Sequence, residues 1–190
     1  MAKVYNNIFV RGLSGAIGDQ FVIRKTKSGQ TIIANKPMFD ENREFTNGQK
    51  AQQEAFRQAS TYAKVARNHP LYIEMTKGSS MNAYNLAMAD WFGEPQVLDI
   101  DISRWTGQIG QEIRVKAQDN VQVSSVRVMI RTSNSSSTAI EEGEAVQSEI
   151  DGLLWTYVTK TLVPMVPGTH LDVMVKDLPG NNGGSSLELN

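Results

Sequence analysis

The sequence contains no cysteine and only two histidines, His69 and His170, among 190 residues. Without a thiol there can be no disulfide bond, thiolate metal site or cysteine nucleophile. Two histidines so far apart in the sequence do not favour a histidine-rich metal centre. The sequence also lacks the run of about 20 apolar residues that a membrane helix needs, and its N-terminus has no apolar run of signal-peptide length. We therefore expect a soluble protein of the cytoplasm, or of a particle assembled there, with no membrane partner.

The sequence has almost no excess of either charge, with a net charge of −1, but the positive and negative residues are unevenly distributed along it. Residues 1–93 hold 12 Lys and Arg against 7 Asp and Glu, which is +5, while residues 94–190 hold 7 against 13, which is −6. The chain is long enough for two domains of about 100 residues each. Two domains with different surface charge explain the asymmetry. The alternative is head-to-tail attraction between copies of the chain.

Three glycines spaced by three residues, Gly12, Gly15 and Gly18, raise the question of a phosphate-binding loop. Such a loop follows a strand and opens a helix whose N-terminus holds the anion. A strand is expected before the glycines, at residues 5–10, but the residues after them, QFVIRK and TIIA around a Lys-Ser-Gly turn, predict a β-hairpin. We therefore expect the glycines to supply positive φ angles or close packing where the chain reverses, and we assign no cofactor site.

Three helices are expected after Pro37 and a polar loop. Thr46 and Gln49 form a capping-box pattern that opens a helix to about Arg67, and further helices follow at residues 71–77 and 81–91, the last capped by residues 78–80. The first helix carries a stripe of small and aromatic residues at helical spacing. The members of this stripe are Ala51, Ala55, Ala59, Tyr62, Ala63 and Ala66. The third helix carries Met81, Tyr84, Met88 and Trp91 at the same spacing. We interpret both stripes as core, and the alternative is that the methionines and aromatic residues form a partner-binding face.

Basic residues gather on the glycine segment and the hairpin. They are Arg11, Arg24, Lys25, Lys27 and Lys36. Such residues can contact nucleic-acid phosphates, but the sequence contains no helix-turn-helix or zinc-finger pattern. A solvated basic face is the favoured interpretation, and nucleic acid is not an expected partner.

The first half resembles small uncharacterised proteins of phages and bacteria, some of which look like particle components. The resemblance covers about residues 10 to 90. It lies in the Gly-rich opening, the hairpin VIRKTKSGQTII, the following Pro and a polar helix with Thr46, Gln49, Phe56 and Ala59. It implies a broad structural role and brings no catalytic residues.

After Gly93-Glu94-Pro95 the apolar residues alternate, which is typical of half-buried strands. Some seven short strands are expected between residues 97 and 189, with residues 178–184 as a loop, and this spacing favours a β-sandwich. The sequence therefore predicts an α+β protein with two domains. Residues 1–93 form a β-hairpin and three-helix docking domain, and residues 94–190 form the sandwich.

The second half resembles bacterial immunoglobulin-like domains. The matching motifs are Gly-x-x-Ile-x-Val-x-Ala-x-Asp from Gly110 to Asp119, Trp155-x-Tyr157, and Pro-Gly-Thr-x-Leu-x-Val from Pro167 to Val173. This half lacks the cysteine pair of antibody domains, as such bacterial modules commonly do. The resemblance implies an Ig-like sandwich that acts as a binding or spacing unit, and the fold alone names no ligand.

Several aspartates are candidates for metal binding. Asp119, Asp151 and Asp177 lie in turns and could meet at one end of the sandwich as calcium ligands, but aspartate in turns is common, and so we assign no metal. Asp99 and Asp101 would share one strand face.

A group of aromatic residues and a group of glutamates each have a functional and a structural interpretation. Trp105, Trp155 and Tyr157 could stack on a sugar, with core packing favoured. Four glutamates could supply paired carboxylates for glycoside hydrolysis, with a solvated acidic face favoured. They are Glu141, Glu142, Glu144 and Glu149. We assign no catalytic residue.

These observations predict a non-enzymatic structural protein that is present in many copies in a phage or phage-derived particle and acts through protein contacts and self-association. The alternative is a carbohydrate- or ligand-binding module, which requires Trp105 or Trp155 to be exposed beside polar groups. An enzyme would need clustered carboxylates or His170 in a concave site.

Overall fold

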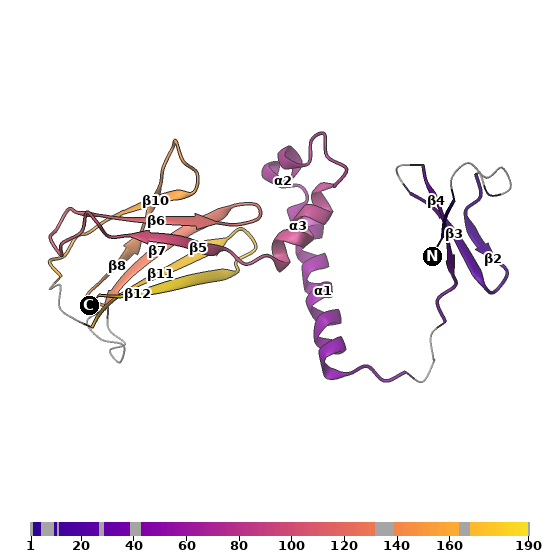
Figure 1. The fold of residues 1–190 in the computed structure, drawn as a ribbon, viewed down its shortest axis with the longest axis horizontal. Coiled ribbons are helices and arrows are strands. Elements are labelled where there is room, and N and C mark those ends of the chain that lie inside the picture. Colours follow the sequence, from indigo (N-terminus) through magenta and orange to yellow (C-terminus); the bar gives the residue numbers. More distant parts are fainter. Residues whose placement is uncertain are drawn as a thin grey trace. The chain divides into compact units, whose positions relative to one another are not determined.

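The structure is a computed structural model of the chain (Figure 1). It describes residues 2–4, 10, 12–26, 29–38, 43–131, 139–163 and 168–189. The chain forms two compact units, Met1–Lys50 and Ala51–Asn190, called here the N-terminal and C-terminal units. The class is mixed α+β, as predicted. The domain division after residue 93 stays a prediction, although the helical residues from Ala51 onward belong to the C-terminal unit.

The N-terminal unit contains a four-stranded antiparallel sheet in the order β1-β4-β3-β2. Its strands are β1 (Ala2–Val4), β2 (Gly15–Ile17), β3 (Phe21–Lys25) and β4 (Thr31–Asn35). The hairpin of β3 and β4 is confirmed, with Phe21 opposite Asn35 and Lys25 opposite Thr31. β2 was not predicted, because glycine is rare in strands. Of the strand expected at residues 5–10, only Val10 is described, and it lies in a turn.

Three helices follow, as predicted, with small shifts at their ends. α1 runs over Asn47–Ala66, α2 over Pro70–Met75 and α3 over Ala83–Phe92. The capping box of α1 is confirmed, because Thr46 N donates to Gln49 Oε1 at 3.1 Å and Gln49 N donates to Thr46 Oγ1 at 3.3 Å. The cap expected for α3 at residues 78–80 is wrong. Asn82 is the N-cap, since its side chain accepts from Asn85 N at 2.8 Å.

The rest of the C-terminal unit is two antiparallel sheets, ordered β5-β6-β10-β9 and β12-β11-β7-β8 (Figure 1). Eight strands are described where some seven were expected. They are β5 (Gln96–Asp101), β6 (Glu112–Gln118), β7 (Val123–Arg131), β8 (Glu141–Glu144), β9 (Val146–Gln147), β10 (Leu154–Val158), β11 (Thr169–Asp177) and β12 (Asn182–Leu189).

Alternation along the strands builds one core that both sheets share. The buried side chains include Ile113 and Val115 of β6, Val126 and Val128 of β7, and Leu171 of β11. Each is separated from its neighbour on the strand by one residue that faces outward, which is the pattern that the sequence predicted. This cluster supplies most of the apolar burial of the chain's described residues.

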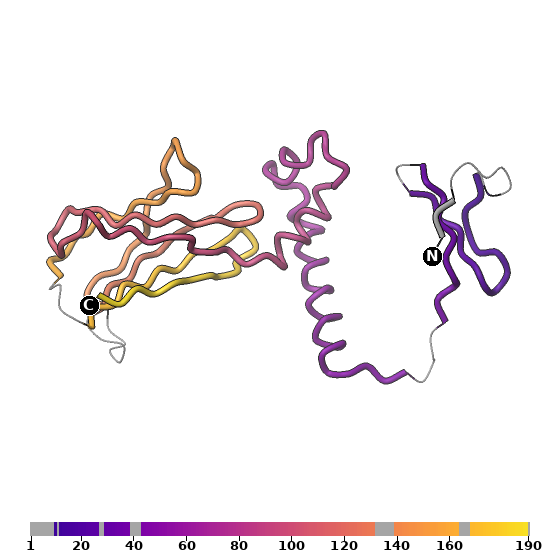
Figure 2. Tube along the Cα trace, in the orientation of Figure 1, coloured from indigo at the N-terminus to yellow at the C-terminus, as the bar shows by residue number. Residues whose placement is uncertain are grey.

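The prediction of a loop over residues 178–184 is wrong for its last three residues, because β12 begins at Asn182. Gly183 pairs with Val175 and Gly184 with Met174 of β11. A side chain at Gly183 would meet the carbonyl oxygen of Pro95, so glycine lets β12 lie against the chain that enters β5 (Figure 2). Glycine disfavours strands on its own, but here a close backbone approach requires it.

Candidate functional site

The three glycines have positive φ angles, as predicted, and Gly12 and Gly18 lie in turns. Gly12, Gly15 and Gly18 have φ angles of 93°, 120° and 56°, which side chains rarely adopt. Gly15 begins β2, and the turn at Gly18 leads into β3 rather than into a helix. Because an anion loop of this kind needs a following helix N-terminus, the segment serves an antiparallel ribbon.

The sheet of the N-terminal unit leaves large apolar side chains uncovered. Ile17 and Phe21 are cross-strand partners and therefore share a face. They are 50% and 42% exposed, and Leu13 just before β2 is 47% exposed. Among the residues of this unit whose side chains the structure describes, which leaves out those of β1, Ile23 is the one buried hydrophobic side chain. We call Ile17 and Phe21 the N-terminal apolar patch. A sheet with an apolar face is stabilised when that face is buried against another element.

The alanine stripe of α1 is buried over only half of its length. Ala59 and Ala63 are fully buried, and Ser60 Oγ lies 2.8 Å from the hydroxyl of Tyr84 on α3. Ala51 and Phe56 are exposed, so the first half of the helix does not pack as core. An Arg57–Glu54 ion pair at 2.7 Å lies on this half, and its hydrogen bonds lower the pKa of Glu54 to about 2.

The helices are joined to the paired sheets by two asparagines on neighbouring turns. Asn181, between β11 and β12, donates its amide to the carbonyl oxygens of Trp91 at 3.2 Å and Gly93 at 2.8 Å. Asn120, after β6, donates to the carbonyl oxygen of Ala89 at 3.2 Å. The Asn181 bonds satisfy carbonyl groups at and just beyond the C-terminal end of α3, where the helix supplies no partner, and the Asn120 bond adds a second donor to the Ala89 carbonyl, which already accepts from Gly93 N at 3.1 Å.

Behind the asparagines lies a buried polar chain that sequence reasoning missed. The hydroxyl of Tyr62 on α1 lies 2.7 Å from that of Tyr72 on α2, which in turn donates to Asp90 Oδ2 on α3. Tyr72 and Asp90 are fully buried, and burial raises the pKa of both. The available signal was a lone aspartate in the otherwise uncharged segment AYNLAMADWF, three residues after the buried Ala87.

Two of the three turn aspartates lie near the same residue, Asp90 of α3. Asp119 and Asp177 both lie close enough to Asp90 to raise its pKa. Asp151 instead accepts from Leu153 N at 3.0 Å in the turn before β10. Within the described part of the chain, no three His, Asp or Glu side chains are arranged to hold a metal ion.

The glutamate group is divided between two environments, so the expected solvated acidic face is wrong for Glu141. Its carboxylate is buried and accepts from the Tyr157 hydroxyl at 2.5 Å, Lys160 N at 2.6 Å and Thr161 N at 3.0 Å. Glu142 and Glu144 on the same strand are exposed. Glu141 therefore acts as an internal acceptor for a turn, and burial raises the pKa of Tyr157.

The two tryptophans that are candidates for sugar stacking are core residues. Trp105 and Trp155 are 3% and 6% exposed, and Tyr157 is buried beside them. The ligand-binding alternative required one of these indoles to be exposed, so it loses its support. His170 is also buried, on β11.

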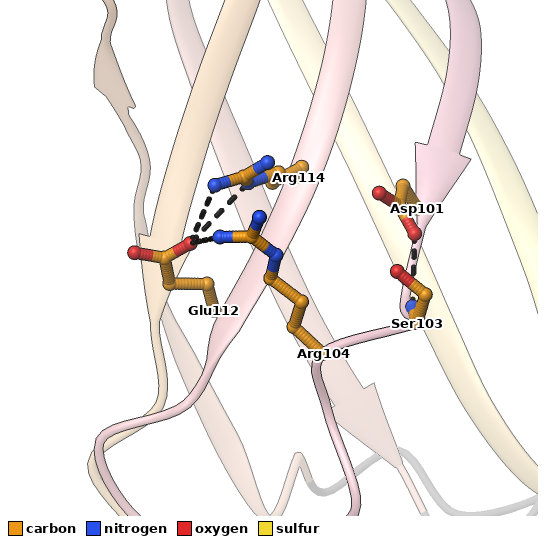
Figure 3. A network of polar contacts seen from close by, with 5 residues as sticks. All are labelled: Asp101, Ser103, Arg104, Glu112 and Arg114. Carbon is orange, nitrogen blue, oxygen red and sulfur yellow. Dashed lines mark hydrogen bonds and ion pairs between the residues drawn. The ribbon is translucent and has the colours of Figure 1, made fainter.

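A surface network of charged residues lies at the C-terminal end of β5 and the N-terminal end of β6 (Figure 3). These are the strand ends that lie away from the helix contacts. Glu112 accepts from Arg114 at 3.0 Å and from Arg104 at 3.4 Å, and Asp101 accepts from Ser103 N at 2.9 Å. The Ser103 hydrogen bonds hold the pKa of Asp101 below its ordinary value. Asp99 and Asp101 follow a β-bulge and face Lys116 and Arg114 across the ladder. Exposed pairs of this kind contribute little stability.

Two depressions lined by described residues have the size of a small-molecule site. One of about 640 Å³ lies over β7, β11 and β12. The arginines that line it are already paired, Arg131 with Asp172 and Arg127 with Glu142. The other, of about 450 Å³, lies between α1, α2 and Leu178, and both tyrosines of the buried chain line it.

Comparison with protein-family models, with curated proteins and with solved structures finds no match for this chain. Among the helices described, none combines the length and apolar character needed to cross a bilayer.

Proposed function

We propose that this protein is a non-enzymatic structural component that assembles in many copies, in a phage or phage-derived particle, through contacts between the N-terminal unit of one copy and the C-terminal unit of another. The N-terminal apolar patch is the observation that carries the proposal. Ile17 and Phe21 lie side by side and stay about half exposed, and Ile23 is the one buried hydrophobic residue among the side chains described for this unit. A second surface that covers the patch would complete its core.

Charge complementarity supports a second copy as the occupant. The N-terminal unit holds 8 Lys and Arg against 4 Asp and Glu, a net charge of +4, and the C-terminal unit holds 11 against 16, a net charge of −5. Opposite charges on the two units favour a head-to-tail contact, which propagates into a ring or a filament. The particle setting rests on the resemblance of residues 10 to 90.

The order of the strands supports an Ig-like sandwich as the projecting or linking module. Lettered in chain order, β5, β6, β10 and β9 make a sheet A-B-E-D, and β12, β11, β7 and β8 make a sheet G-F-C-C′. This is the arrangement of immunoglobulin-like domains. The chain departs from antibody domains in having no cysteine and in placing its buried Trp155 on β10 rather than on β7.

Replacing both patch residues, Ile17→Ser with Phe21→Ser, is expected to shift the weight-average mass toward the monomer mass of 21.0 kDa. Losing two large apolar anchors weakens a contact by about 2 kcal/mol or more, which is a factor of 30 in affinity. Light scattering after size-exclusion chromatography, at several concentrations and at low and high salt, measures this. Salt should also reduce the mass, because it screens the attraction.

The control variant is Ile150→Ser, which removes a 99% exposed side chain between β9 and β10 and should leave the mass unchanged. A wild-type chain that stays monomeric at high concentration and low salt contradicts the proposal. Electron microscopy of the associated fraction then distinguishes a ring or filament from amorphous aggregate, which would also contradict it.

A further inference from the structure

The contact between the helices and the paired sheets encloses three carboxyl groups from three elements. Asp90 comes from α3, Asp119 from the turn between β6 and β7, and Asp177 from the end of β11. Asp90 and Asp177 are 0% and 1% exposed. Among the described residues, no Lys or Arg forms an ion pair with any of the three. Uncompensated buried carboxylates are unfavourable, so something else must neutralise this site.

Most of the carboxyl oxygens have ordinary partners, and two do not. Asp177 Oδ1 accepts from Gly180 N and Asn181 N, and Asp177 Oδ2 accepts from the Asn181 amide. Asp119 Oδ2 accepts from Val121 N and Gln122 N, both at 3.1 Å. Asp90 Oδ1 and Asp119 Oδ1 are buried and receive no N–H or O–H from any described residue.

The two oxygens without a donor belong to side chains whose neighbours in the chain are bonded to each other, since Asn120 donates to the carbonyl oxygen of Ala89 at 3.2 Å, and Asp119 is among the groups that raise the pKa of Asp90. Two ionised carboxylates cannot form a hydrogen bond, because both only accept. One proton between them turns one group into a donor and satisfies both oxygens at once. It also removes one negative charge from a site that holds three carboxyl groups.

We propose that Asp90 and Asp119 share one proton, and that this proton is part of what holds the helices against the paired sheets. Asp90 supplies the helix side of the contact and Asp119 the sheet side. The proton therefore takes the place that a Lys or Arg would fill at another domain contact, with the difference that it leaves as the pH rises.

The surroundings of Asp90 favour the protonated form. Burial raises its pKa to about 7, the Tyr72 hydroxyl opposes this, and Asp119 and Asp177 add to the increase. The other ionisable groups that face the site are Tyr62 from α1, Tyr72 from α2 and His69, whose ring meets that of Tyr72 edge to face. The Tyr62–Tyr72–Asp90 chain ends at the depression between α1 and α2, which both tyrosines line.

The sign of the pH dependence follows from the raised pKa. A carboxyl group that binds its proton more tightly when folded stabilises the fold fully below its unfolded pKa, near 4, and this stabilisation is lost as the pH rises to about 7. The contact is therefore weakest above neutral pH. Most buried carboxylates with lowered pKa values produce the opposite slope.

The test uses Asp90→Asn and Asp119→Asn in the full chain. Either asparagine can donate an amide N–H to the remaining carboxylate without a proton, and its oxygen can keep the other bonds. Thermal unfolding is followed from pH 4.5 to 8 by tryptophan fluorescence, since Trp91, Trp105 and Trp155 all lie in the C-terminal unit. The wild-type Tm should fall by roughly 5–10 °C up to pH 7 and then level off. The variants should lose this fall and be the more stable proteins at pH 8.

Two controls isolate the pair. Asp151→Asn makes the same change in a turn at a distance from the site and should keep the wild-type pH dependence. His69→Asn keeps a side-chain acceptor at the cap of α2 while removing the imidazole beside Tyr72, and should also keep the wild-type pH dependence. If His69→Asn abolishes the pH dependence, or if Asp90→Asn and Asp119→Asn both retain it, the shared proton is excluded.

Infrared spectroscopy detects the proton without reference to stability. The wild-type protein at pH 5.5 should show the carbonyl band of a protonated carboxylic acid, which disappears above pH 8 and is absent in Asp90→Asn. A wild-type spectrum without a band that Asp90→Asn removes would overturn the proposal, even if one variant failed to fold.

Discussion

Gly183→Ala is expected to destabilise the paired sheets by roughly 3 kcal/mol or more, at the upper end of what overpacking costs. A Cβ at this position would lie 1.8 Å from the carbonyl oxygen of Pro95 and 2.9 Å from its carbonyl carbon. Both atoms belong to the backbone, and Pro95 is buried. Neither strand can move aside without breaking the pairing of β12 with β11 or the entry into β5. Chemical denaturation followed by tryptophan fluorescence measures the loss.

The matched control is Gly48→Ala, near the start of α1, where an added Cβ meets nothing within 4 Å. Since alanine is the better helix former, by up to about 1 kcal/mol, this variant should be as stable as the wild type or more so. Equal stability of Gly183→Ala and wild type would mean that β12 does not lie against Pro95, and the packing described for this edge would be wrong.

Glu141→Ala is expected to cost about 3 kcal/mol or more. The carboxylate accepts three hydrogen bonds, from the Tyr157 hydroxyl and from the backbone N–H groups of Lys160 and Thr161. Removing it leaves these donors without an acceptor in a buried region, and each such donor costs about 1–3 kcal/mol unless water enters. Thermal or chemical unfolding of the purified variant measures the change.

Glu144→Ala is the control for this prediction, because Glu144 ends the same strand and is exposed. Its effect should stay within about 0.5 kcal/mol. If both variants unfold alike, Glu141 is a surface carboxylate and its interpretation as an internal acceptor fails.

Local patterns in the sequence predicted the elements whose stability is local. Thr46 and Gln49 predicted the start of α1 because the capping box is formed by residues three apart. Alternation at Ile113, Val115 and Ala117 predicted β6 and the face that it buries, because side chains alternate across a strand.

Features that depend on distant residues were not predictable in the same way. β12 begins with glycines that disfavour a strand, and it forms because β11 and Pro95 lie beside it. Asp90 and Asp119 are 29 positions apart in the sequence, and only the folded chain brings them together. The exposure of Ala51 and Phe56 could not be predicted either. A helical stripe indicates which face of a helix can be buried, but not how much of that face a neighbouring element covers.

Cross-linking between isotopically distinct copies tests the proposed assembly most directly. Equal amounts of ¹⁴N- and ¹⁵N-labelled protein are mixed, treated with a carbodiimide that joins lysines to carboxylates, and analysed by mass spectrometry. We expect mixed-isotope links between lysines of Met1–Lys50, such as Lys25 and Lys36, and carboxylates of Ala51–Asn190. The double variant Ile17→Ser with Phe21→Ser should remove these links. Links found only within single-isotope copies would contradict it.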